Sequence, residues 1–193
     1  MSSPPPAGLA VEVKEVLSSS SPAIVTAMGE EGDLVSERLA RGCRCFGAWL
    51  GPEVVAYGWL STMAEWIGEL GLEIKPASGE AYVWNCMTLA AHRRKGIFRT
   101  LLFCITAQAR KEGLARLWIG SVGKTGEKAI AEAGFNPVMR LELLRLPWLH
   151  WLRVRAADRA DMGLVGSARY ALAVGGRPIG SRFLPGHSRS RRH

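Results

Sequence analysis

The chain has 193 residues, a hydrophobic content of 48% and a formal net charge of +8 at pH 7. This hydrophobic content excludes a wholly disordered chain, and no uncharged apolar run approaches the roughly 18 residues of a membrane-spanning helix. Residues 1–6 lack the charged and apolar regions of a secretion signal. We therefore expect a cytoplasmic protein with one main domain and a flexible N-terminus at 1–8.

The positive charge is concentrated near the C-terminus. Residues 147–193 hold nine arginines and two aspartates, so the preceding residues carry a net charge of only about +1. This distribution argues against nucleic-acid binding by the whole protein. We expect residues 175–193 to form a flexible basic tail, and any contact that it makes with nucleic acid or an anionic membrane to be non-specific.

The four cysteines do not have the spacing of a metal site. Cys43 and Cys45 are close together, but no second pair of ligands accompanies them, and Cys86 and Cys104 lie in apolar runs. We expect four reduced thiols and no bound metal.

In the first half of the chain, Val11 and Val13 alternate with charged residues and predict a strand. Ser21 and Pro22 are typical of a helix start, and the apolar spacing that follows predicts two short helices before Gly42.

The middle of the chain predicts mostly strands. Residues 43–50 and 54–63 are two strand-like runs joined by Gly51-Pro52-Glu53, whose turn chemistry predicts a hairpin. Residues 64–78 mix apolar residues, glutamates and glycines, and we expect an irregular insertion. Residues 81–89 form an apolar run that predicts another strand.

In the second half, helices alternate with strands. Helical spacing and strand-like runs predict, in order, a helix at 97–112, a strand at 115–120, a helix at 125–133 and a strand at 138–146. The whole order is β–α–α–β–β–β–α–β–α–β. It predicts an α/β (α+β) domain over 9–146 with a mixed central sheet flanked by helices. We also expect a last strand at 168–174.

The turn Arg93-Arg94-Lys95-Gly96 connects a predicted strand to the clearest predicted helix. The first N–H groups of a helix lack partners and carry partial positive charge. Glycine lets the backbone approach an anion closely. The turn therefore predicts a phosphate or pyrophosphate site; the alternative is a solvated basic turn.

The run Arg93-x-x-Gly96-x-Phe98 resembles the Arg/Gln-x-x-Gly-x-Gly/Ala acyl-CoA signature of the GNAT superfamily of acyl-CoA N-acyltransferases. Phe98 stands where the family usually has a small residue. The element order is similar too, and Gly134-Phe135 closes a helix where the family closes one. The resemblance implies a GNAT-like fold, acetyl-CoA as co-substrate and direct attack by an amine, without an acyl-enzyme.

The resemblance also implies a set of site residues. Those expected to bind the cofactor are Met87, Thr88, Leu89, Arg93, Arg94, Lys95, Gly96, Ile97, Phe98 and Arg99. A backbone N–H near Met87 or Thr88 would stabilise the developing oxyanion, so Thr88 is a catalytic candidate. The family often has a tyrosine that protonates the leaving thiolate, and Ile130 occupies that position here.

Two further catalytic candidates lie on the predicted strand before the turn. Strict alternation would place five residues on one face: Glu80, Tyr82, Trp84, Cys86 and Thr88. Glu80 is the first candidate for the base, with a polar strand start as the alternative. Tyr82 is the second, with simple packing as the alternative.

These observations predict an N-acetyltransferase that transfers an acetyl group to a primary amine on a small molecule, with a homodimer left open. One alternative is a catalytically weak acyl-CoA-binding module, because the family tyrosine is missing. The other is an interaction protein that acts through its basic tail.

Overall fold

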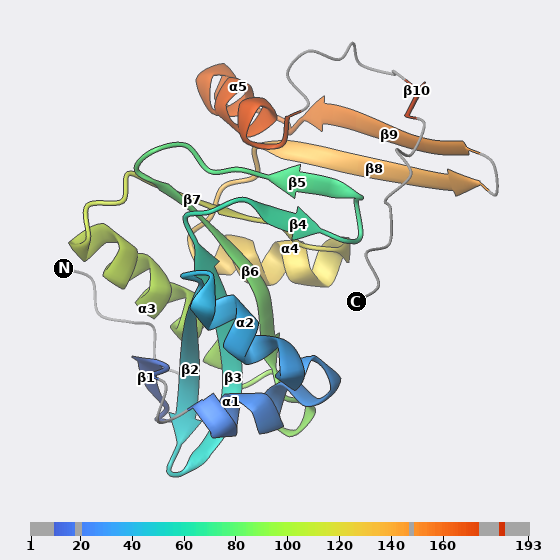
Figure 1. The fold of residues 1–193 in the computed structure, drawn as a ribbon. Coiled ribbons are helices and arrows are strands. Elements are labelled where there is room, and N and C mark those ends of the chain that lie inside the picture. Colours follow the sequence, from blue (N-terminus) through green and yellow to red (C-terminus); the bar gives the residue numbers. More distant parts are fainter. Residues whose placement is uncertain (1–9, 18–20, 147–148, 174–181, 184–193) are drawn as a thin grey trace. The chain divides into compact units, whose positions relative to one another are not determined.

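A computed structural model gives the fold of the chain (Figure 1). It describes residues 10–17, 21–146, 149–173 and 182–183. The segments expected to be flexible, 1–8 and 175–193, lie outside the described residues, except that Arg182–Phe183 form a short strand. In this described part of the chain, no helix has the length and hydrophobicity needed to cross a bilayer.

The chain divides into two compact units. The first comprises residues 1–65 and 75–135, and the second comprises 66–74 and 136–193. The division differs from the expected single domain over 9–146, because residues 136–146 group with the C-terminal segment.

The first unit is built on a five-stranded sheet with the order β1-β2-β3-β6-β7. Its strands are β1 Glu12–Glu15, β2 Arg44–Leu50, β3 Glu53–Ser61, β6 Glu80–Thr88 and β7 Arg116–Ile119. Neighbours are antiparallel except β6 and β7, which are parallel. The expected mixed sheet and the hairpin of β2 and β3 are thereby confirmed.

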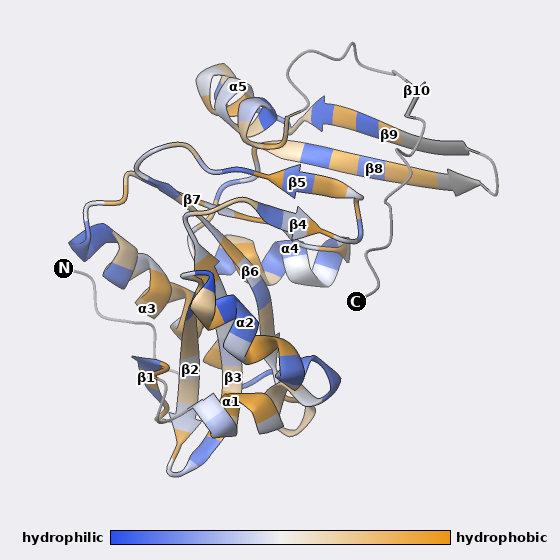
Figure 2. Cartoon of the chain, in the orientation of Figure 1, coloured by the Kyte–Doolittle hydropathy of each residue, from blue (hydrophilic) through white to orange (hydrophobic). Residues whose placement is uncertain are grey.

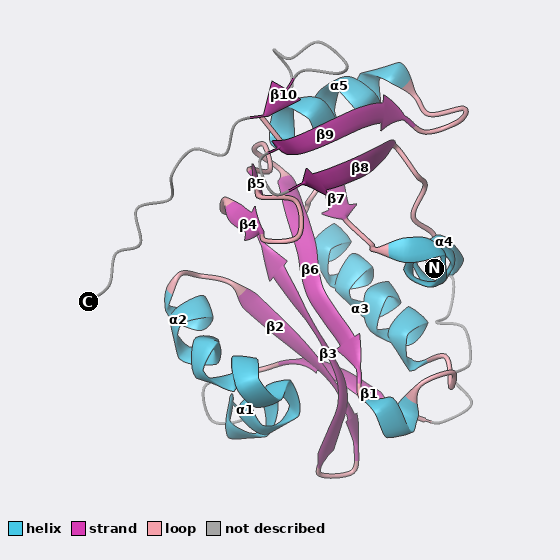
Figure 3. Ribbon diagram, turned by 90° about the vertical axis from the view of Figure 1, so that its right-hand side faces the viewer, coloured by secondary structure: helices cyan, strands magenta, loops and turns pink. Residues whose placement is uncertain are grey.

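Helices cover both faces of this sheet (Figure 3). On one face lie α1 Ser21–Met28, the 3-10 turn η2 Gly29–Leu34 and α2 Val35–Ala40, and on the other α3 Ile97–Lys111 with α4 Gly123–Glu132 beside it. Each face has its own buried core, and the strands between the layers are largely hydrophobic (Figure 2). Burying each large aliphatic side chain contributes about 1.5–3 kcal/mol.

The second unit has a three-stranded antiparallel sheet with the order β10-β9-β8. Its elements are β8 Met139–Leu146, β9 Leu149–Ala156, α5 Met162–Ala171 and β10 Arg182–Phe183. Within residues 64–78, which were expected to be irregular, β4 Glu65–Ile67 and β5 Leu72–Ile74 form a two-stranded sheet.

The strand predicted at 168–174 is wrong, because its first four residues are the end of α5. The side chain of Asp161 accepts a hydrogen bond from the Leu164 N–H (2.8 Å) and caps the helix start. Val165, Ala168 and Ala171 are buried at helical spacing. Three- and four-residue spacing, not alternation, therefore determines the conformation here.

A β-bulge interrupts β6. Tyr57 pairs with Met87 and Trp59 pairs with Trp84, so two residues of β6 face the single Gly58 of β3. One of these two, Asn85, has a φ of 41°. A bulge changes which side chains share a face. The prediction of one shared face from Glu80 to Thr88 is therefore wrong.

The bulge separates the two halves of β6. Trp84 packs on the core beneath α1 and α2, whereas Cys86 packs on the core beneath α3. Side chains alternate again after the bulge, so Thr88 lies on the same face as Cys86. Leu89 packs with the core beneath α1 and α2.

Gly58 accommodates this bulge because it has no Cβ. A Cβ there would lie 2.7 Å from the Cys86 Sγ and 3.3 Å from the Ile105 Cδ1. We expect Gly58→Ala to lower the free energy of unfolding by about 1–3 kcal/mol through overpacking. Urea unfolding in a double-mutant cycle should show a smaller cost in a Cys86→Ala background.

The control is Gly120→Ala, whose added Cβ would meet its nearest atom, the Tyr82 Oη, at 3.8 Å. It should change stability by less than about 0.5 kcal/mol. An equal cost of Gly58→Ala with and without the Cys86 thiol would contradict this account of the bulge.

Candidate functional site

The parallel strands β6 and β7 pair over only part of their length. Their partners run from Glu80 with Arg116 to Val83 with Ile119. From Trp84 to Thr88, β6 pairs within the described chain with β3 alone. The sheet therefore opens on the β7 side of β6, and backbone groups on that side need other partners.

The N–H of Thr88 points into this opening. The next N–H along the chain, that of Leu89, donates to the Val55 carbonyl on β3 (2.9 Å). Successive N–H groups of an extended chain point to opposite sides. Thr88 thus presents a backbone donor at the edge where β7 has separated.

The opening leads directly to the basic turn before α3. Arg94 (φ 61°) and Gly96 (φ 78°) both have left-handed backbone conformations. Such residues turn neighbouring N–H groups toward one concavity, which favours an anion. Gly96 is also the N-cap of the 15-residue α3 and makes no side-chain cap hydrogen bond. The first N–H groups of α3 are therefore free of capping side chains.

The three cations of this turn and Arg99 in the first turn of α3 differ in their contacts. Arg93 Nε donates to the Thr88 carbonyl (3.2 Å) and Lys95 Nζ to the Ala91 carbonyl (3.0 Å), so both stabilise the turn itself. Arg94 is exposed and makes no ion pair or hydrogen bond with the rest of the described chain. Arg99 Nε is buried and without a partner there. Arg94 and Arg99 thus retain donors for an anion.

The remaining residues expected at this site have mainly packing side chains. Ile97, the first residue of α3, is buried in the core, and Phe98 packs against the same core, so only their backbone N–H groups can bind an anion. Met87 is 42% exposed, and its Sδ lies 3.7 Å from the Tyr57 Oη, which donates to it.

Glu80 and Thr88 lie at opposite ends of β6. Eight residue steps along a strand correspond to about 26 Å. The buried Glu80 carboxylate accepts hydrogen bonds from Arg116 Nη1, from Trp118 Nε1 (2.7 Å) and from the Ala77 N–H (3.3 Å). This geometry favours a structural role for Glu80, which holds β7 against β6.

Tyr82 is better placed than Glu80 to reach the opening. It is 8% exposed, and its Oη approaches Gly120, the residue that follows the last paired residue of β7. The structure therefore brings Tyr82 near the inner end of the opening, where β6 and β7 begin to pair.

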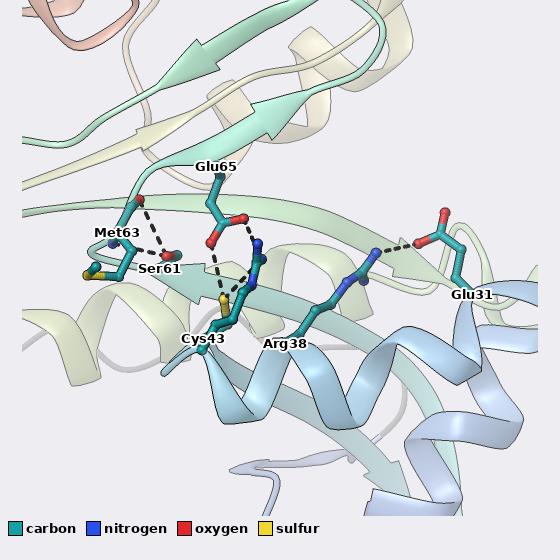
Figure 4. A network of polar contacts seen from close by, with 7 residues as sticks. Glu31, Arg38, Cys43, Ser61, Met63 and Glu65 are labelled. Carbon is teal, nitrogen blue, oxygen red and sulfur yellow. Dashed lines mark hydrogen bonds and ion pairs between the residues drawn. The ribbon is translucent and has the colours of Figure 1, made fainter. Parts of the chain in front are cut away.

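Sequence reasoning missed a polar cluster beneath α1 and α2 (Figure 4). The Glu31 Oε2 accepts hydrogen bonds from Arg38 Nη2 (2.9 Å) and Asn85 Nδ2 (2.6 Å). The guanidinium of Arg38 lies over the rings of Trp59 (5.3 Å) and Trp84 (4.6 Å). The spacing of Arg38 from the buried Val35 is a helical signal that could have placed it on the inner face.

Burial suppresses the ionisation of two side chains on the strands next to this cluster. Burial, with the nearby Glu31 charge, raises the pKa of Tyr57, so its phenol stays neutral at pH 7. Burial raises the pKa of Cys86 to about 12, which excludes it as a thiolate nucleophile at neutral pH.

A second network joins the segment between α2 and β2 to Glu65 at the start of β4 (Figure 4). The Cys43 Sγ donates to Glu65 Oε1 (3.1 Å), and Arg41 Nη2 donates to Glu65 Oε2 (2.9 Å). Burial and the Glu65 carboxylate raise the pKa of the Cys43 thiol. All four cysteines are free thiols, as expected, and the part of the chain that is described has no three-residue cluster of metal-ligating side chains.

The chain is similar to one protein family and to several solved structures. The model of the acetyltransferase (GNAT) family matches residues 14–133. A search of curated proteins finds no match.

Several solved structures share the fold. An aminoglycoside N-acetyltransferase in complex with CoA is 12% identical, with a TM-score of 0.55, over 70% of this chain and 98% of that chain. A ribosomal-protein-alanine N-acetyltransferase from Brucella melitensis is 16% identical, with a TM-score of 0.52, over 71% and 100% of the two chains. A Trypanosoma brucei acetyltransferase is 14% identical, with the same TM-score of 0.52, over 71% and 100%.

The Glu80 network predicts a stability effect. Glu80→Gln removes the charge opposite Arg116 and leaves one donor beside it unsatisfied. We expect the free energy of unfolding to fall by about 1–3 kcal/mol. Chemical denaturation measures this, with the exposed Glu73→Gln as the control. Unchanged stability would show that Glu80 does not hold the two strands together.

Proposed function

As the chain belongs to the GNAT family of acetyltransferases, we propose that it transfers an acetyl group from acetyl-CoA to a primary amine on a small molecule. The family match confirms the resemblance to the GNAT superfamily, and the chain is an N-acetyltransferase. The observation that carries the proposal is the continuity of the opening beside β6 with the anion-binding turn before α3.

The residues of this chain fit acetyl-CoA. The left-handed residues Arg94 and Gly96 and the uncapped start of α3 suit a pyrophosphate. So does the buried Arg99 Nε, which has no partner in the described part of the chain. The Thr88 N–H and the free edge of β6 suit an extended arm with amide groups, which can pair with a strand edge. When bound, acetyl-CoA supplies the thioester that the amine attacks.

The residues around the turn and the opening have distinct roles in this proposal. Arg94 and Arg99 neutralise the phosphates, and Arg93 and Lys95 hold the turn in shape through Thr88 and Ala91. Backbone N–H groups at the opening stabilise the negative charge that develops on the thioester oxygen. Tyr82 lies near the inner end of the opening and is our candidate to hydrogen-bond the departing sulfur, in place of the family tyrosine.

The acceptor in this proposal is a small amine. An aminoglycoside N-acetyltransferase with the same fold acts on a small-molecule amine, which is compatible with the proposal. The Brucella structure has the same fold but is named for a protein acceptor, ribosomal-protein alanine. The fold alone therefore does not determine the acceptor. The choice rests on the side chains that face the opening.

Charge reversal in the turn tests the proposal. We expect Arg94→Glu to weaken acetyl-CoA binding about tenfold or more, because it replaces an attraction to phosphate with a repulsion. Isothermal titration calorimetry with acetyl-CoA measures the change. Lys111→Glu is the matched control, because Lys111 is exposed at the other end of α3, about 21 Å away.

The control should bind acetyl-CoA as tightly as the wild type does. Equal weakening in both variants would indicate a general effect of net charge. Wild-type affinity in Arg94→Glu would contradict the placement of the pyrophosphate.

A further inference from the structure

The two carboxylate oxygens of Glu31 differ in their hydrogen bonds. Its Oε2 takes the hydrogen bonds from both Arg38 and Asn85, whereas no described donor reaches its Oε1. The side chain is 53% exposed, although its partner Arg38 is only 9% exposed. The carboxylate is therefore held rigidly on one side and accessible from solvent on the other.

Asn85 connects this carboxylate to the opening in the sheet. It lies in the bulge of β6, two positions after Val83, the last residue of β6 that pairs with β7. An extended arm that starts at the anion-binding turn and follows the free edge of β6 must end where the two strands rejoin. The reactive end of such an arm therefore lies beside Asn85, whose side chain points to Glu31.

Arg38 provides an independent indication of a ligand. It is buried, its guanidinium lies over the rings of Trp59 and Trp84, and its Nη1 has no hydrogen-bond partner in the described chain. A buried guanidinium nitrogen is costly to leave unpaired. It lies next to the Glu31 carboxylate, so a polar group of a ligand at this place would satisfy it.

We propose that Glu31 is the catalytic base of this enzyme, and that its open carboxylate oxygen binds the ammonium group of the acceptor. This inference rests on the acetyl transfer proposed above. It selects cationic primary amines as the acceptor class. Arg38 and Asn85 are positioning residues, which fix the carboxylate toward the end of the opening.

The transfer balances in protons and electrons. Glu31 takes one proton from the ammonium group, which leaves a neutral amine. The nitrogen lone pair then forms the C–N bond, the C–S bond breaks, and its electron pair leaves on sulfur. The extra proton on nitrogen passes to the thiolate, and Glu31 releases its own proton to solvent through its exposed side.

Charged and polar groups face Glu31 from several elements. Arg38 on α2 supplies a guanidinium, and Tyr57 on β3 is neutral because burial raises its pKa. Asn85 on β6 does not titrate. Glu30 and Asp33 share the turn η2 with Glu31 and are exposed.

Rates as a function of pH test the inference. The probes are a panel of cationic primary amines (aliphatic polyamines, amino sugars and aminoglycosides), and CoA release is followed from pH 6 to 9.5. In Glu31→Gln, only amine that arrives unprotonated can react. We expect kcat/KM at pH 7 to fall about 100-fold. This deficit should shrink about tenfold per pH unit, because free amine increases that way below its pKa near 10.

The neighbouring Glu30→Gln is the matched control and should retain the wild-type profile. Glu31→Asp should recover part of the rate, because it keeps a carboxylate. A purely structural role for Glu31 predicts the same loss at every pH, and this result would overturn the inference. So would wild-type rates in Glu31→Gln.

Acetyl-CoA binding separates this inference from the proposed function. Calorimetry should give Glu31→Gln the wild-type affinity for acetyl-CoA, because Glu31 lies outside the pyrophosphate turn. Failure of the wild type to bind acetyl-CoA would refute the proposed function itself. Binding without CoA release for any amine of the panel would leave the cofactor in place and refute the cationic acceptor class.

Discussion

The incomplete pairing of β6 with β7 is the constraint on which the rest of the site depends. Four residues of β6 pair with β7, and along the rest of the strand this edge has no partner strand among the residues that the structure describes. Backbone groups on such an edge are costly to leave without partners, so the edge is a natural place for an amide-bearing ligand. The Glu80 carboxylate, with Arg116 and Trp118, holds the paired half together. It thereby determines where the opening ends.

The bulge at Asn85 determines which face of the sheet each neighbouring side chain reaches. Without the extra residue, Trp84 and Cys86 would lie on the same face of the sheet. With it, the thiol packs beneath α3, and Asn85 reaches Glu31 on the face of α1 and α2. In the mechanism that we propose, the same irregularity connects the edge for the acyl donor to the Glu31 carboxylate, which binds the acceptor. Cation–π contacts of about 0.5–2 kcal/mol help to hold Arg38 in this arrangement.

The sequence predicts the parts of this architecture whose signals are local. The hairpin turn at 51–53 and the basic turn before α3 each combine characteristic residues with an adjacent periodic segment. The bulge has no such signal, because it depends on the pairing of Asn85 and Cys86 with Gly58, far away in the chain. The contact of Glu31 with Asn85 spans 54 residues and depends on that bulge. By contrast, the Asp161 cap of α5 is a local signal. It predicts a helix, but we expected a strand at 168–174 instead.

The central claim is that acetyl-CoA occupies the open edge of β6 and the turn that follows it. Amide hydrogen exchange with and without acetyl-CoA tests this claim most directly. The account predicts that the ligand slows exchange at Thr88 and at the first N–H groups of α3, Ile97 to Arg99. It predicts no change at the paired residues of β2 and β3. Unchanged exchange at Thr88 and the start of α3, with saturating acetyl-CoA bound, would contradict it.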